Sequence, residues 1–311
     1  MKKPLKFIKI LGFNLLFIAF ILLFAEICCL VYECNIILGY CKDESADKKI
    51  LALENFIKAS YKKDLINIYN FRNPSYAAPN QKTSKSSIII AGGSYTYGWL
   101  LDNKDAFHSV LAENSNRTVY NLGIGSGSPR EMLYTLRNNE LFDELTNNDD
   151  NVEYYIYTFI NNHIRRLYYD LDINAPYYKP DKTYSRLIFK KTNFFQHFFI
   201  YKDIYCLLKF RFSSQESKSK LFMLYLKEIQ KEINTKFGKN GKTPEFIILI
   251  YPQDESINWK EIENLNIKVI SAEQLTSVDL DTEEYKASDN AHPGAKAWQV
   301  IVPALVKELG L

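Results

Sequence analysis

The stretch that decides the fold reads SIIIAGGSYTYG, residues 87–98. Its apolar first half is typical of a buried strand, and it ends at two glycines and a serine. Apolar runs at 117–122 and 152–160 also end in polar or glycine-rich loops, and two shorter runs follow at 245–251 and 267–270. Helical stretches separate these runs. Such alternation predicts a parallel five-stranded sheet covered by helices on both faces.

Three loops that follow the first three strands carry the residues suited to chemistry. They contain Ser94, the glycine-rich segment 123–127, and the polar segment 161–163. In a parallel sheet these loops meet at the carboxyl edge, where ligands bind. A serine in a glycine-flanked turn suits an exposed nucleophile beside backbone N–H groups. The alternatives are a plain strand-to-helix turn, or a phosphate loop that lacks the usual glycine motifs.

A second segment, ASDNAHPGAKAW at 287–298, places Asp289 and His292 three residues apart before a closing helix. A serine nucleophile needs a base, and the base needs an acid that fixes its tautomer. One loop could supply both. The alternative is a turn-capping aspartate beside a surface histidine.

Together these segments resemble the SGNH/GDSL hydrolase superfamily over residues 87–163 and 244–311. GGSYTYG is similar to the GGSxTxG variant of its first motif, with Gly93 in place of the usual Asp, and Asp289, His292 and Pro293 match its DxxHP motif. The resemblance implies a three-layer α/β/α sandwich with a flavodoxin-like sheet. It also implies a catalytic triad of Ser94, Asp289 and His292.

The same resemblance implies an oxyanion hole at the carboxyl edge of the sheet. Its donors would be the N–H of Ser94, an N–H from the segment after the second strand, and the Asn161 side chain. FINNH at 159–163 matches the family's GxND only in part, so Asn162 or His163 could replace Asn161. The spacing after the second strand does not choose one donor; Gly125 and Ser126 are the preferred candidates, beside Gly123 and Gly127.

An aromatic-rich insertion is predicted at about 164–220, directly after the third strand. Asn162, His163, Arg165 and Arg166 would lie next to the site, where guanidinium groups could bind an anionic or sugar substrate. The alternative is that the insertion's aromatic residues pack its own small core.

The first forty residues predict a membrane anchor. Four lysines among the first nine residues precede an apolar run from Ile10 to Tyr32, interrupted by Asn14 and Glu26. The basic flank predicts a cytoplasmic N-terminus and an extracytoplasmic domain. A cleaved signal peptide or lipoprotein signal fits less well, because small residues are missing where cleavage would occur. The predicted division is anchor 1–33, stalk 34–85 and SGNH hydrolase-like domain 86–311; Cys34 and Cys41 could form a disulfide or remain thiols.

The charge pattern excludes a nucleic-acid footprint, because 39 basic and 36 acidic residues give a net charge of only +3. No metal-ligand cluster is visible, so no metal or organic cofactor is predicted, and the oligomeric state is left open. The predicted function is a serine esterase that hydrolyses an acyl, chiefly O-acetyl, ester on a cell-envelope glycan. An O-acyltransferase with the same triad and a non-catalytic envelope scaffold are the alternatives.

Overall fold

The computed structural model describes residues 14, 17–18, 20–28, 31, 75–77, 86–125, 127–137, 151–168, 177–181, 186–190, 206–239, 241–251 and 257–311. The chain divides into two compact units. The larger comprises 69–167, 175–190 and 213–311, and it holds the sheet and the described residues of the predicted site. The smaller comprises 1–68, 168–174 and 191–212.

The predicted anchor is only partly covered by the described residues, of which 20–28 are helical. Among the helices that the structure describes, none combines the length and the apolar character that crossing a bilayer requires. The rest of the predicted anchor, most of the stalk, and Cys34 and Cys41 lie outside the described residues.

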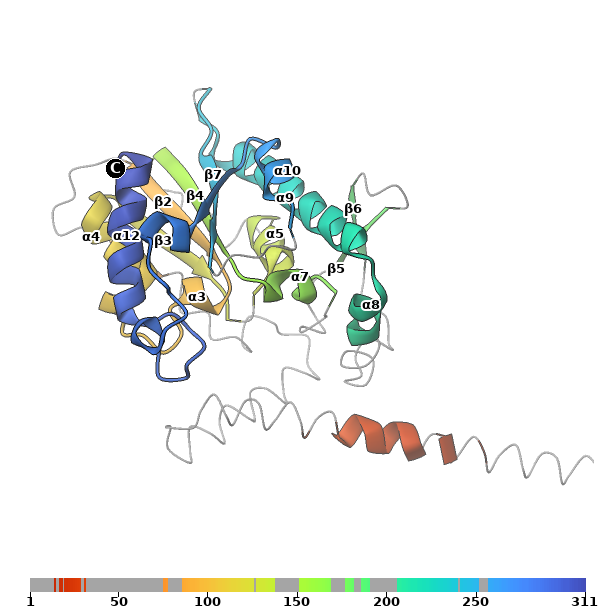
Figure 1. Ribbon diagram of the computed structural model, residues 1–311. Coiled ribbons are helices and arrows are strands. Elements are labelled where there is room, and N and C mark those ends of the chain that lie inside the picture. Colours follow the sequence, from red (N-terminus) through yellow and green to blue (C-terminus); the bar gives the residue numbers. More distant parts are fainter. Residues whose placement is uncertain are drawn as a thin grey trace, which may run out of the picture. The chain divides into compact units, whose positions relative to one another are not determined.

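A parallel five-stranded sheet forms the centre of the larger unit, as predicted (Figure 1). Its strands run in the order β3-β2-β4-β7-β8, the arrangement of flavodoxin-like doubly wound sheets. Their bounds are β2 (Ser86–Gly92), β3 (Thr118–Gly123), β4 (Asn151–Phe159), β7 (Glu245–Ile250) and β8 (Lys268–Ser271). A sixth strand, β1 (Ser75–Ala77), pairs antiparallel with β3. The sequence pattern did not predict β1, because three residues are too few to show a period.

Helices cover both faces of this sheet (Figure 1). On one face lie α4 (Phe107–Ser115) and α12 (Ala295–Leu309), which share a buried core with Ile247 and Leu249 of β7. The other face carries α5 (Pro129–Arg137) and α9 (Gln215–Phe237), where Tyr155 of β4 lies beside Phe237. The alternation of side chains along each strand therefore supplies both cores.

The closing helix α12 is continuous through Pro303. Proline removes the hydrogen bond to the carbonyl four residues earlier, that of Gln299. Gln299 and Pro303 are both exposed, so the hydrogen bond that the proline removes would lie on the solvent-exposed side of the helix. On the opposite side, Trp298 stacks on Phe107 with ring centroids 4.5 Å apart, and both side chains are fully buried.

The region of the predicted insertion contains strands as well as helices. After α7 (Asn162–Arg166), the strands β5 (Tyr177–Pro180) and β6 (Leu187–Lys190) pair antiparallel. In the smaller unit, the ring of Tyr168 contacts Phe210 of α8 (Leu207–Phe212). The remaining short elements are α3 (Ser94–Tyr97), η2 (Asn103–Asp105), α10 (Trp259–Glu263), α11 (Ala272–Thr276) and η5 (Glu283–Tyr285).

Candidate active site

The nucleophile turn lies between β2 and α3. Ser94 is the first residue of α3, and 8% of its surface is exposed. Close packing holds the short helix on the end of β3: a Cβ added to Gly123 would lie 2.4 Å from the backbone nitrogen of Tyr97. Only glycine at position 123 permits this approach. The turn therefore has a fixed support on the neighbouring strand.

Ser94, His292 and Asp289 form a hydrogen-bonded series. Nε2 of His292 lies 2.8 Å from Oγ of Ser94, and Nδ1 of His292 lies 2.5 Å from Oδ2 of Asp289. An ionised carboxylate accepts only, so Nδ1 carries the proton and Nε2 is free to accept one from the serine. The fold thus brings together three residues, two of which are separated from Ser94 by more than 190 positions in the chain.

The carboxylate of Asp289 is held by its own loop. Its Oδ1 accepts hydrogen bonds from the backbone N–H groups of Ala291 and His292, each at 3.0 Å. Partial burial raises the pKa of Asp289, but these two bonds and the His292 imidazole outweigh burial and hold the pKa below its usual value. Asp289 therefore remains ionised wherever His292 could act as a base.

Backbone hydrogen bonds narrow the choice of oxyanion donor after β3. The N–H of Gly123 donates to Oδ1 of Asn121 at 2.8 Å, and the N–H of Gly127 donates to the carbonyl of Ile124 at 2.8 Å. Both groups are therefore occupied. Of the four candidates, Gly125 and Ser126 remain; Ser126 lies outside the described residues.

Asn161 follows β4 at the same edge of the sheet as Ser94. Gly92 of β2 is in register with Thr158 of β4, so Ser94 and Asn161 lie two and three residues beyond paired positions. Asn161 and Asn162 are both exposed, and Asn161 makes no side-chain capping bond to α7. This placement is compatible with the predicted role of Asn161 as a donor.

The predicted substrate-binding residues of α7 separate into buried and exposed side chains. Arg165 is exposed, whereas His163 is fully buried and thus is not accessible to a substrate in this conformation. The Nδ1 atom of His163 lies 2.6 Å from the Tyr157 hydroxyl, and its Nε2 has no hydrogen-bond partner among the residues that the structure describes. Arg166, partly buried, donates from Nη1 to the carbonyl of Gly127 at 2.9 Å.

His163 and Arg166 also explain the glycine at position 93. A Cβ added there would lie 2.7 Å from Nε2 of His163 and 3.2 Å from Nη1 of Arg166. The side chains of His163 and Arg166 thus fill the space that a side chain at 93 would need. The packing around position 93 therefore suits a glycine.

Two buried polar residues that sequence reasoning missed connect these loops. Nδ2 of Asn121 donates to the carbonyl of Thr96 in α3 at 3.0 Å, while its Oδ1 accepts from Gly123. Nδ1 of His108 in α4 lies 3.2 Å from the same Nδ2. A polar residue inside the otherwise apolar strand VYNL was the signal that could have identified Asn121.

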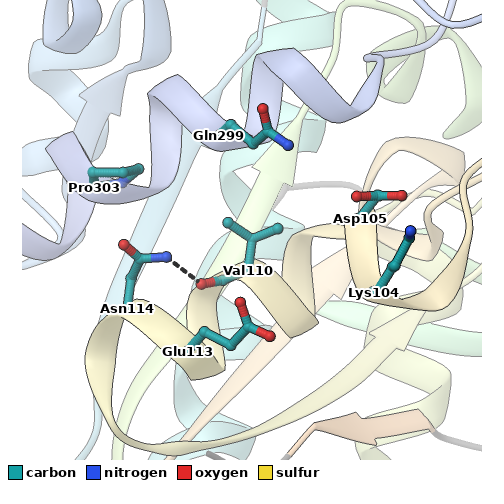
Figure 2. A pocket seen from close by; sticks show the side chains of 7 residues that line it. All are labelled: Lys104, Asp105, Val110, Glu113, Asn114, Gln299 and Pro303. Atoms are coloured by element: carbon teal, nitrogen blue, oxygen red, sulfur yellow. Dashed lines mark hydrogen bonds between the residues drawn. The ribbon is translucent and has the colours of Figure 1, made fainter.

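An open surface pocket of about 350 Å³ lies elsewhere, between α4 and α12 (Figure 2). Its lining includes Glu113, Asn114, Gln299 and Pro303, and none of the predicted catalytic residues.

Comparisons with known proteins found solved structures that resemble the chain only at low sequence identity and low TM-score. No family model and no curated protein matches the chain. Solved structures similar to it include a member of the lipolytic protein G-D-S-L family from Veillonella parvula DSM 2008, with 15% identity and a TM-score of 0.43 over 71% of this chain and 97% of that one. Another is the lipase Lip_vut3 from a goat rumen metagenome, with 15% identity and a TM-score of 0.40 over 71% and 95%. At these values the likeness assigns neither a family nor an activity to this chain.

Proposed function

We propose that the chain is a serine esterase in which Ser94, His292 and Asp289 are the catalytic residues. The observation that carries this proposal is the hydrogen-bonded series from Ser94 Oγ through the His292 ring to the Asp289 carboxylate, at 2.8 and 2.5 Å. A non-catalytic scaffold has no need of this alignment across the fold.

In the proposed reaction, Ser94 Oγ attacks the ester carbonyl carbon while Nε2 of His292 takes its proton. Asp289 holds the ring and stabilises the imidazolium that forms. The N–H of Ser94, an N–H from 125–126 and the Asn161 amide would bind the oxyanion. The carbon–oxygen bond to the alcohol then breaks, and the leaving oxygen receives the proton from His292. Water, activated by His292, releases the acid from Ser94.

The proposed substrate is an acylated, chiefly O-acetylated, glycan of the cell envelope. Support comes from the basic and apolar beginning of the chain, which predicts an anchor and an external domain. The residues of α7 beside the site, Asn162 and Arg165, are exposed and suited to sugar hydroxyls or anionic groups. An acyltransferase would use the same residues but pass the acyl group to a sugar hydroxyl.

The test compares the purified full-length chain with Ser94→Ala on p-nitrophenyl acetate and on an O-acetylated glycan. Ser109→Ala is the matched control, because Ser109 of α4 is also 8% exposed and has no role in the proposed site. We expect hydrolysis by the wild type and Ser109→Ala and none above background by Ser94→Ala. Acetyl transfer to an added glycan, without free acetate, would identify the acyltransferase. Equal rates for wild type and Ser94→Ala would exclude Ser94 as nucleophile.

A further inference from the structure

The residue that follows the nucleophile connects Ser94 to the loop that carries its base. The hydroxyl of Tyr95 donates to the backbone carbonyl of Ala291 at 2.6 Å, across 196 positions of the chain. Ala291 stands between Asp289 and His292. The helix α3 and the 287–292 loop are thus joined twice, once by Ser94 and His292 and once by a bond in which no proton has to move.

The ring of Tyr95 is itself fixed on two sides. It packs against the His292 ring, with centroids 5.3 Å apart, and meets Tyr251 edge to face at 5.4 Å. The hydroxyl of Tyr251 in turn donates to the carbonyl of Leu280 at 3.3 Å. Burial, and then the charge of Asp289, raise the pKa of Tyr95, so its hydroxyl stays protonated and remains a donor.

The loop needs a support from outside. Residues 288–291 at its tip are all exposed, and Asn290 has a positive φ of 57°. Its internal bonds, from Ala287 N–H to the His292 carbonyl and from Asn290 N–H to the Ala287 carbonyl, close the loop on itself but do not attach it to the sheet. A segment with few buried contacts opens at low free-energy cost. The Tyr95–Ala291 bond is placed to limit that opening.

We propose that Tyr95 is a positioning residue, which holds the 287–292 loop on α3 and so sets the distance between Ser94 Oγ and His292 Nε2. The catalytic part of this proposal rests on the proposed esterase function. The structural part, that Tyr95 restrains the loop, does not depend on it. The Tyr95 hydroxyl bonds a backbone carbonyl and takes no part in the proposed proton transfer. Tyr95 acts by restraining the loop so that His292 stays close to its productive position, which affects turnover rather than substrate affinity.

The test is Tyr95→Phe, which keeps the ring and removes one hydroxyl. Tyr154→Phe is the matched control, because the Tyr154 hydroxyl also donates to a backbone carbonyl of the C-terminal segment, that of Leu309 at 3.2 Å, outside the site. With p-nitrophenyl acetate we expect kcat of Tyr95→Phe to fall about three- to tenfold with KM unchanged, as loss of one neutral hydrogen bond predicts. The control retains its kcat.

A second measurement does not depend on activity. Amide hydrogen exchange in peptides covering 286–294 is expected to accelerate in Tyr95→Phe and to stay at the wild-type rate in Tyr154→Phe. Unchanged exchange in Tyr95→Phe would overturn the proposal, and so would faster exchange with unchanged kcat in an active enzyme. If the wild type proves inactive on esters, the proposed function fails, and hydrogen exchange still decides whether Tyr95 restrains the loop.

Discussion

Replacing Gly93 by alanine tests how tightly the nucleophile turn is packed. The added Cβ would lie 2.7 Å from Nε2 of His163, whereas comfortable contacts need about 3.5 Å. His163 cannot easily retreat, because it is fully buried, bonded to the Tyr157 hydroxyl and stacked on the Tyr157 ring at 5.5 Å. Overpacking of this kind costs about 1–3 kcal/mol, which for a domain of this size lowers Tm by about 2–12 °C.

Calorimetry and the p-nitrophenyl acetate assay together measure the effect. A shift of the turn by a fraction of an ångström is expected to lower kcat by about tenfold or more, because misplacement of about 1 Å costs about a hundredfold. Gly125→Ala is the control for stability, since among the described residues its Cβ would meet no atom nearer than 3.9 Å. Gly93→Asp should lower both Tm and kcat further than Gly93→Ala does, because the larger side chain needs more of the same space. A Gly93→Ala protein with wild-type Tm and kcat would refute the reasoning.

Three further changes have defined outcomes. Burial, and then the Arg166 charge, hold the pKa of His163 well below its usual value, so the folded protein leaves it neutral while the unfolded chain binds a proton below about pH 6.5. The contribution of His163 to the free energy of unfolding is fully present above that pH and falls by up to about 1.4 kcal/mol per pH unit below it. In urea unfolding, the free energy of unfolding of His163→Asn should therefore depend less steeply on pH between pH 7 and 5 than that of the wild type. An unchanged slope would contradict this assignment. Asp289→Asn should lower kcat about 10³- to 10⁴-fold with little change in KM, because the carboxylate that fixes the tautomer of the His292 ring is lost. Ester hydrolysis assays measure this change, and a tenfold effect or less would argue against the triad. Arg166→Gln removes the hydrogen bond to the Gly127 carbonyl and should lower kcat about tenfold, which steady-state kinetics would measure. Full activity would mean that the 124–128 loop keeps its conformation without this hydrogen bond.

Much of the sheet could be predicted because its strands are buried on both faces. Runs such as IIIA at 88–91 and FIILI at 246–250 are continuously apolar, and the turns that follow them are rich in glycine or polar residues. The short strand β1 and the hairpin of β5 and β6 were missed for the opposite reason. Their pairing depends on the neighbouring strand more than on their own four or fewer residues.

The site could be predicted from the sequence where the proposed chemistry requires a particular residue type, such as a serine nucleophile or a histidine base. Ser94, Asp289 and His292 could be named from their motifs, and the structure places them within hydrogen-bond reach, although their catalytic roles stay a prediction. The supporting contacts could not be predicted. Whether His163 faces a substrate or the underside of Gly93 depends on which way α7 turns after β4, and no local pattern specifies that rotation.

The two bonds between α3 and the 287–292 loop have a consequence for biosynthesis. Their partners are separated by 198 and 196 positions, and the loop is followed by α12, which packs against α4 near the start of the domain. Closing so long a segment is slow and comes late in folding. A nascent chain on the ribosome would therefore carry its serine for most of its synthesis without a base to activate it. Under the proposed function, Ser94 would be activated only once the 287–292 loop has docked on α3.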